Sequence, residues 1–216
     1  MPALDDLAHQ LRPSAGPVAG ALVLMHGRGT DENDLFGLLD VLDPERRLAG
    51  ACPRGPLTLP PGGHHWYIVP RVGFPDPESF QSTFARLDRW LAALAEHTGV
   101  APERTILGGF SQGAVMAWAL GAAQGRPRPA GILAMSGFIP TVEGFEIEAA
   151  TLEGLPVAIA HGTHDPIIAV DFGHDARGRA TQAGAHVFYR ESPITHTLDP
   201  KVLPELADWV AATLSD

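Results

Sequence analysis

The sequence predicts an α/β fold with a mostly parallel central sheet and helices on both of its faces. Three observations lead to this prediction: short apolar runs recur along the chain, the runs are continuous rather than alternating, and helix-forming segments lie between them. A parallel strand buried on both faces gives a continuous apolar run, and regular alternation of strands with helices is typical of a parallel sheet. No internal repeat or linker interrupts the pattern, so residues 1–216 are expected to form one domain without a separate cap domain.

Five apolar runs and a weaker sixth are interpreted as the strands of this sheet. Most of them are bounded by Gly or Pro, which interrupt regular structure. In chain order they lie at 21–25 (ALVLM), near 48–52, and at 105–107 (TIL), 130–135 (AGILAM), 156–160 (PVAIA) and 185–189 (AHVFY).

The helices are predicted from apolar residues spaced three and four apart. The clearest helix spans 79–97 and ends at Gly99, and a second spans 201–214 with Asp199-Pro200 as its cap and first turn. Shorter helices are expected at 32–42, 112–124 and 167–183. The apolar stripe of the first helix consists of Phe80, Phe84, Leu87, Leu91 and Leu94.

The composition excludes several classes of function. The chain has 15 basic and 25 acidic residues, and a formal net charge of -10 repels nucleic acid and anionic lipid. A lone cysteine, Cys52, cannot form an internal disulfide. No apolar run approaches the length of a membrane span, and the first residues lack the basic and apolar regions of a secretory signal. We therefore expect a cytoplasmic protein with no membrane insertion.

A candidate nucleophile follows the strand at 105–107. Residues 109–113 fit the pattern G-x-S-x-G with Ser111 at its centre, between an apolar strand and an Ala-rich helical segment. A nucleophile on a sharp strand-to-helix turn needs strained backbone angles, and Gly109 and Gly113 remove side chains that would collide there. The alternative interpretation is a Gly-flanked turn in which Ser111 only caps a helix.

A candidate acid follows the strand at 156–160. Asp165 lies in the loop at the end of that strand, where it could also simply cap a helix beginning at Pro166. A third interpretation makes His161, His164 and Asp165 a metal cluster. It is disfavoured because neither a cysteine nor a second carboxylate lies nearby.

A candidate base follows the strand at 185–189. His196 lies in the loop before the last helix, where an isolated histidine is usually just solvated. However, Ser111, Asp165 and His196 appear in the order Ser, Asp, His that is typical of α/β-hydrolases, and each follows a different strand. His196 is expected to take the proton of Ser111 while Asp165 orients the imidazole. Such a triad supplies the nucleophile, the base and the electrostatic stabilisation that the reaction needs, so neither a cofactor nor a metal is expected.

The loop after the first strand, His26-Gly27-Arg28-Gly29-Thr30, is the candidate for half of an oxyanion hole. We assign its donors as the backbone N–H groups of Arg28 and Gln112. The alternatives are an ordinary strand-to-helix turn and a dinucleotide site, and the second fails because Glu32 occupies the position of the third glycine.

Five blocks together resemble a known family: MHGRGTDENDL, GGFSQGA, MSGFIP, HGTHDPII and His196 near the end. They look like the phospholipase/carboxylesterase family of small α/β-hydrolases, which includes carboxylesterases, lysophospholipases and acyl-protein thioesterases. The resemblance runs in order from Gly20 to Trp209. It implies the same triad and oxyanion donors, and a homodimer. Relatives often have an apolar residue where this chain has Arg28 and Gly where it has Thr195, which leaves the substrate open. The 60–77 region resembles the bacterial esterases more than the thioesterases.

Without a cap domain the site should be an open cleft that covers short acyl chains. A CH₂ group of the acyl chain adds about 0.8 kcal/mol of binding free energy only when it is buried, so a chain that protrudes from such a cleft gains little. We therefore expect a serine carboxylesterase that acts on small-molecule esters with roughly two to eight acyl carbons. The reaction is expected to pass through an acyl-enzyme intermediate. The alternatives are a thioesterase or lysophospholipase for long acyl chains, for which 60–77 could form a groove or mobile lid, and an inactive hydrolase fold used for binding. The side chains expected to form the walls of the cleft are Trp66, Phe138, Ile139 and Ile167. Each of them could instead belong to the hydrophobic core.

Overall fold

The computed structural model describes residues 4–215, so the ends of the expected 1–216 unit lie outside the described residues. Its centre is a seven-stranded sheet with the order β1-β3-β2-β6-β7-β8-β9. All neighbouring strands are parallel except β1, which pairs antiparallel with β3. The strands are β1 (His9–Arg12), β2 (Gly20–Met25), β3 (Leu48–Pro53), β6 (Thr105–Phe110), β7 (Gly131–Met135), β8 (Pro156–Gly162) and β9 (His186–Ser192), and β4 (Leu57–Thr58) with β5 (His64–His65) forms a separate small ladder.

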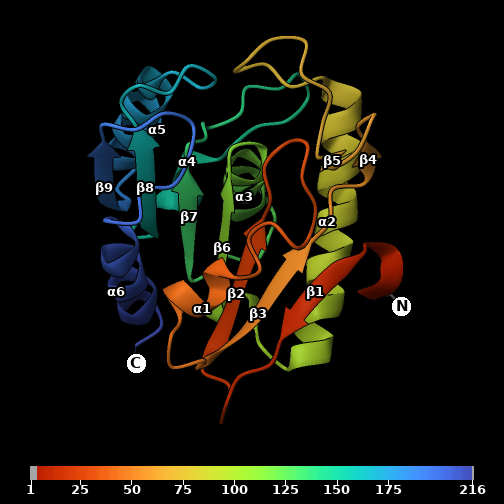
Figure 1. Cartoon of the computed structure of the whole chain (residues 1–216), viewed down its shortest axis with the longest axis vertical. Coiled ribbons are helices and arrows are strands. Elements are labelled where there is room, and N and C mark those ends of the chain that lie inside the picture. Colours follow the sequence, from red (N-terminus) through yellow and green to blue (C-terminus); the bar gives the residue numbers. More distant parts are fainter. Residues whose placement is uncertain (1–3, 216) are drawn as a thin grey trace.

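Helices cover both faces of the sheet (Figure 1). The long helix α2 (Pro77–Thr98) packs on one face with α3 (Gln112–Ala122), α4 (Ala149–Leu152) and α5 (Val170–Gln182). On the other face α1 (Leu38–Leu42) lies against α6 (Leu203–Thr213). Two 3-10 turns, Leu4–Asp6 and Pro102–Arg104, complete the elements. Within 4–215 no helix combines the length and the apolar content that crossing a bilayer demands.

The burial pattern explains why the strands read as continuous apolar runs. In β2, Val23 and Met25 join the core beneath α2 and α3, whereas Leu22 and Leu24 join the core beneath α1 and α6. Successive side chains of a strand point to opposite faces. Because both faces are covered by helices, both sets are buried, and the expected mostly parallel sheet with helices on both sides is confirmed.

Several elements differ from their predicted bounds. The helix expected at 32–42 begins at Leu38, because the Asp31 side chain accepts the backbone N–H of Asn33 and holds the preceding residues in turns. The antiparallel strand β1 was not expected, since the sequence HQLR has no apolar run. It is an edge strand whose hydrogen bonds come from β3 and whose side chains need not be apolar.

Strand β6 extends beyond the predicted 105–107 as far as Phe110, so it includes two glycines. A methyl group built at Gly108 would lie 3.0 Å from the Leu24 side chain on β2. Gly108 therefore leaves room for side chains of the neighbouring strands β2 and β7 near the end of β6. This strand end is the place at which the candidate nucleophile emerges.

Candidate active site

Ser111 occupies the turn between β6 and α3 in a strained conformation. Its φ is 55° and its ψ is -119°, and its N–H donates to the carbonyl of Met135 at 2.9 Å. A methyl group at Gly113 would lie 1.9 Å from the Met25 carbonyl oxygen, and one at Gly109 would lie 2.4 Å from the Gly113 carbonyl carbon. No side chain fits at either position, which is the steric requirement that the G-x-S-x-G pattern predicted.

Ser111, His196 and Asp165 form one hydrogen-bond chain. The Ser111 Oγ lies 2.9 Å from His196 Nε2, and His196 Nδ1 lies 2.6 Å from Asp165 Oδ2. An ionised carboxylate only accepts, so Nδ1 carries the proton and Nε2 presents its lone pair to the hydroxyl. The Asp165 side chain is fully buried, whereas 17% of the His196 side chain remains exposed. The imidazole can therefore take the Ser111 proton while the buried carboxylate stabilises the charge that results.

The Asp165 side chain is held by backbone groups of its own loop and does not cap a helix. Its Oδ1 accepts the backbone N–H groups of Ile167 and Ile168, both at 2.8 Å, which leaves Oδ2 for His196. Helix α5 begins only at Val170, so the alternative of Asp165 capping a helix at Pro166 does not describe the structure. The carboxylate instead closes a turn that fixes its direction.

The residues of the alternative metal interpretation do not converge. His161 is buried, and its Nε2 donates to the carbonyl of Ile168 at 2.8 Å, whereas His164 is exposed. Across 4–215 no group of three or more His, Cys, Asp or Glu side chains has an arrangement that could hold a metal ion.

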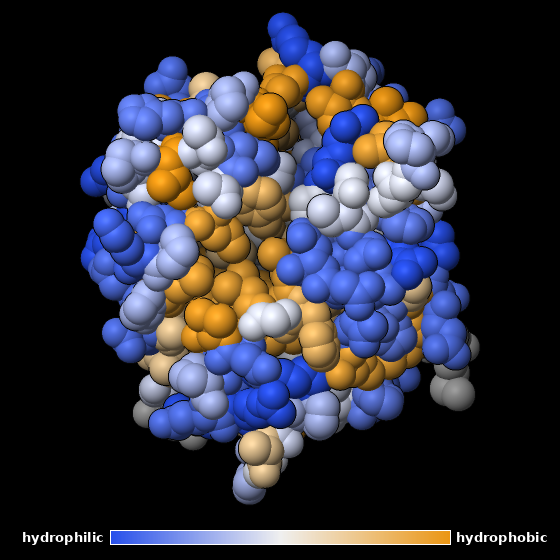
Figure 2. Space-filling model, in the orientation of Figure 1, coloured by the Kyte–Doolittle hydropathy of each residue, from blue (hydrophilic) through white to orange (hydrophobic). Residues whose placement is uncertain are grey.

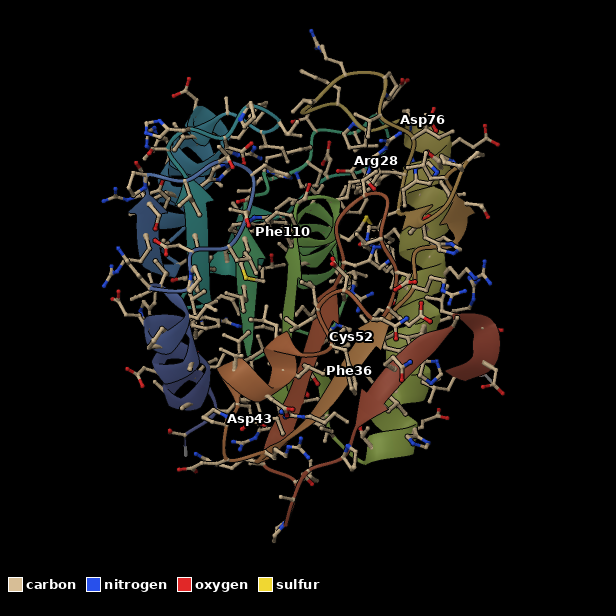
Figure 3. All side chains as sticks on the ribbon, viewed as in Figure 1. Arg28, Phe36, Asp43, Cys52, Asp76 and Phe110 are labelled. Atoms are coloured by element: carbon tan, nitrogen blue, oxygen red, sulfur yellow. The ribbon has the colours of Figure 1, made fainter. Side chains whose placement is uncertain are left out.

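The loop after β2 passes directly over the nucleophile turn. A methyl group built at Gly27 would lie 3.1 Å from the Phe110 ring and 3.7 Å from Ser111 Cβ. Figure 3 shows the neighbouring Arg28 and Phe110 at the same end of the sheet. Gln112 is the first residue of α3, so its N–H has no acceptor within the helix. The two expected oxyanion donors thus lie on segments that meet at Ser111.

The Gln112 side chain has a role that the sequence did not reveal. Its Oε1 accepts the backbone N–H of Trp66 and its Nε2 donates to the carbonyl of Tyr67, both at 3.0 Å. One side chain beside the nucleophile thereby fastens a loop 45 and 46 residues away in sequence. No local spacing could have signalled this contact.

A short backbone ladder joins the same two loops. The N–H of Gly29 donates to the carbonyl of His64, and the N–H of His64 donates to the carbonyl of Thr30, both at 2.7 Å. Gly63 has a φ of 86°, and a methyl group there would lie 2.1 Å from the Gly29 carbonyl. Residues 63–67 are therefore part of the framework of the site and not a free lid.

The expected cleft walls fall into two groups. Phe138 and Ile139 are buried, whereas 58% of Ile167 is exposed at the rim beside Asp165. Trp66 has 0% exposure and its indole N–H donates to the carbonyl of His26 at 2.8 Å. The prediction of Trp66 as a cleft wall is thus corrected: the ring is turned inward to satisfy a buried carbonyl, and it supports the loop from below.

The 68–76 segment carries exposed apolar side chains. The base of this segment is closed, because Asp76 N–H donates to the Ile68 carbonyl and Ile68 N–H donates to Ser79 Oγ, both at 3.0 Å. Figure 2 shows orange apolar side chains at the top of the molecule and in the middle of this face, with hydrophilic residues on either side. The exposed apolar residues of the segment are Ile68, Val69 and Phe74.

Comparisons with known proteins show which proteins this chain is similar to. A family model described as phospholipase/carboxylesterase matches residues 9–214. Acyl-protein thioesterase 1 of Debaryomyces hansenii is 28% identical over 184 residues, covering 77% of this chain and 78% of that protein. The crystal structure of esterase PE8 has a TM-score of 0.79 at 26% identity and covers 96% and 99% of the two chains. The carboxylesterase of Bacillus cereus has a TM-score of 0.84 at 23% identity, covering 96% and 94%, which is a likeness of fold.

Proposed function

The chain belongs to the phospholipase/carboxylesterase family and is a hydrolase that acts on esters, and from this premise we propose that Ser111, His196 and Asp165 are its catalytic triad. The observation that supports the proposal most directly is the continuous hydrogen-bond chain of 2.9 and 2.6 Å between their side chains. The strained backbone of Ser111, held by Gly109 and Gly113, supports it independently. Strain of this kind is maintained where a turn presents a reactive group.

The proposed reaction has two halves. In the first, Ser111 Oγ attacks the ester carbonyl as His196 Nε2 accepts the hydroxyl proton, and the resulting oxyanion accepts hydrogen bonds from the N–H groups of Arg28 and Gln112. The tetrahedral intermediate then collapses, and the alcohol leaves with the proton from His196. In the second half, His196 deprotonates a water that attacks the acyl group on Ser111. Collapse returns the proton to Ser111 and releases the carboxylic acid.

Asp165 acts through His196 in this scheme. Its buried carboxylate fixes the tautomer in which Nδ1 carries the proton, so that Nε2 is free to act as the base. The N–H groups of Ile167 and Ile168 hold the other carboxylate oxygen and stop the group from rotating away. The same charge then stabilises the imidazolium formed in each half-reaction.

For the substrate we propose esters with short to medium acyl chains, roughly two to eight carbons. Phe138 and Ile139 are buried in the core and so offer little exposed apolar surface to a long chain, and the exposed Arg28, next to the Gly27 that faces Ser111, adds a polar element. A second candidate is a thioesterase or lysophospholipase for long acyl chains. It is favoured by the exposed apolar side chains of Ile68, Val69 and Phe74 on the 68–76 segment and of Ile167 beside Asp165, and by the similarity to an acyl-protein thioesterase.

Two measurements test these proposals. The first compares Ser111→Ala with the wild-type chain on a short ester. Loss of the nucleophile costs about a millionfold in kcat in comparable triads, so a folded variant that keeps a tenth of the rate would overturn the triad.

The second measurement follows kcat/KM over acyl esters of roughly two to sixteen carbons, with a matched thioester. Each CH₂ that is buried gains about fourfold. A rise that stops near eight carbons supports the first candidate, and a rise through sixteen or faster thioesters supports the second.

A further inference from the structure

His26, directly after β2, has a backbone partner on each ring nitrogen. Its Nδ1 lies 2.6 Å from the carbonyl oxygen of Gly27, and its Nε2 lies 2.9 Å from the backbone nitrogen of Gly55. The Thr30 hydroxyl also lies near Nδ1, at the longer distance of 3.2 Å. The ring is buried and rests 4.9 Å from the Trp66 ring, centroid to centroid. The triad does not use this imidazole, and nothing in the sequence pattern distinguished it from a core histidine.

The two partners determine which nitrogen carries the proton. A backbone N–H can only donate, so Nε2 is the acceptor from Gly55, and a carbonyl can only accept, so Nδ1–H is the donor to Gly27. Burial lowers the pKa of His26, which favours this neutral form. His26 is therefore a neutral imidazole with its single proton directed at the Gly27 carbonyl.

The Gly27 carbonyl and the Arg28 N–H belong to the same planar peptide unit. In a trans peptide these two groups point in opposite directions, so a bond that holds the carbonyl also fixes the direction of the N–H. Thr30 Oγ lies 3.0 Å from the same carbonyl, but it lies equally close, 3.0 Å, to a carboxylate oxygen of Asp34. A hydroxyl has one proton to donate. Nδ1 of His26 is closer to the Gly27 carbonyl, at 2.6 Å, than to Thr30 Oγ, at 3.2 Å, so His26 is the main donor to this carbonyl.

The same residue is tied to the second expected oxyanion donor. The carbonyl of His26 accepts the indole N–H of Trp66 at 2.8 Å, and the backbone N–H of Trp66 donates to the side chain of Gln112 at 3.0 Å. The Arg28 and Gln112 peptides are therefore held relative to each other through His26 and Trp66. A donor pair preorganised in this way needs no reorganisation when charge develops on the substrate.

We propose that His26 is a positioning residue for the oxyanion hole: its Nδ1–H holds the Gly27 carbonyl so that the Arg28 N–H faces the oxyanion formed at Ser111. The inference rests on the proposed function, since it needs an ester carbonyl to be attacked by Ser111. His26 itself does not touch the reacting atoms. It acts through the peptide between Gly27 and Arg28.

Two substitutions separate this role from packing. His26→Asn places an amide N–H close to the position of Nδ1 and keeps a donor for the Gly27 carbonyl, but it loses the acceptor for Gly55. His26→Gln reaches the position of Nε2 and keeps an acceptor for Gly55, but it loses the donor for Gly27. Both variants lose the contact of the ring with Trp66, so each is the packing control for the other.

The readouts are kcat, KM and affinity for an alkylboronic acid, which forms a tetrahedral adduct on a catalytic serine with an oxygen in the oxyanion hole. Loss of an entire oxyanion donor costs about 100- to 1,000-fold in kcat. We expect His26→Gln to lose about 10- to 100-fold in kcat and in boronic acid affinity, with KM and the affinity for a ground-state amide of equal chain length nearly unchanged. His26→Asn should stay within about threefold of wild type, and so should Thr30→Val.

The outcomes separate this inference from the proposed function. If wild type hydrolyses no ester, or if Ser111→Ala keeps its rate, the proposed function fails. If wild type is active and folded His26→Asn and His26→Gln lose kcat and boronic acid affinity equally, the ring acts by packing and the inference is overturned. If Thr30→Val loses as much kcat and boronic acid affinity as His26→Gln, Thr30 and not His26 positions the Gly27 carbonyl, and the inference is overturned. Should His26→Gln not fold, a collapse of kcat in folded His26→Asn still overturns the inference.

Discussion

The Nε2 of His161 donates a hydrogen bond to the carbonyl oxygen of Ile168, 2.8 Å away. This bond closes the base of the loop that contains Asp165, whose Oδ1 is held in turn by the Ile168 N–H. The same nitrogen lies 3.7 Å from Asp165 Oδ2. His161 thus supports Asp165, the acid of the proposed triad, rather than forming part of a metal cluster.

His161→Ala should lower kcat for a short ester by about 10- to 100-fold while KM changes little, because the Asp165 loop loses its lower tie and small misplacements of catalytic groups have effects of this size. His161→Gln, which keeps an N–H for the Ile168 carbonyl, should recover most of the loss. Steady-state kinetics on variants with matched circular dichroism would check this. A folded His161→Ala enzyme with wild-type kcat would contradict it.

Gly113→Ala should be strongly destabilising, since the added methyl group would lie 1.9 Å from the backbone oxygen of Met25. Overpacking costs about 1–3 kcal/mol, and because a backbone oxygen has little freedom to move we expect the upper value. A loss of about 3 kcal/mol lowers the Tm of a chain of this size by roughly 6–12 °C. Gly37→Ala is the matched control, because nothing lies within 4 Å of that position and its φ is -65°. Equal Tm values for the two variants would refute the steric account of the Ser111 turn.

Stability should fall as the pH drops below about 6.5, the value at which an unfolded histidine gains its proton. Burial lowers the pKa of His26 and of His65 in the folded chain, so over this range the unfolded chain binds more protons and stability rises with pH. Thermal unfolding between roughly pH 8 and pH 5 would measure the slope. His26→Asn should flatten it, and His186→Asn, at an exposed residue of β9, should not. Parallel curves of stability against pH for wild type and His26→Asn would show that His26 does not cause this pH dependence.

Ile167→Ser should reduce kcat/KM for esters of roughly six to eight acyl carbons by about fourfold to tenfold and leave acetate esters unchanged, because only the longer chains reach the rim. Val18→Ser is the control, since Val18 is comparably exposed but lies before β2, at the opposite end of the sheet. An equal effect of Ile167→Ser on all chain lengths would show that this side chain does not contact the acyl group.

Much of the candidate site could be predicted from the sequence because its determinants are local. Ser111 was recognised from a strand, five residues of G-x-S-x-G and a helix, all within one stretch of chain. Asp165 and His196 were recognised because each follows an apolar run, and the carboxyl ends of parallel strands lie at one edge of the sheet. Their catalytic roles remain predictions, but their meeting within hydrogen-bond distance is what this argument required.

The sequence by itself determined the strand and helix periods, the parallel sheet and the turn that presents Ser111, because each depends on side chains within a few residues of one another. Only the tertiary structure decided that Trp66 is buried under the oxyanion loop, that the Gln112 side chain fastens Trp66, and that His26 holds the Gly27 carbonyl. Two of these contacts join residues 40 or more positions apart, and the third depends on which way a ring turns inside a loop fixed from outside. Hydrogen bonding of buried polar groups selects these partners, and the path of the whole chain determines which groups are within reach.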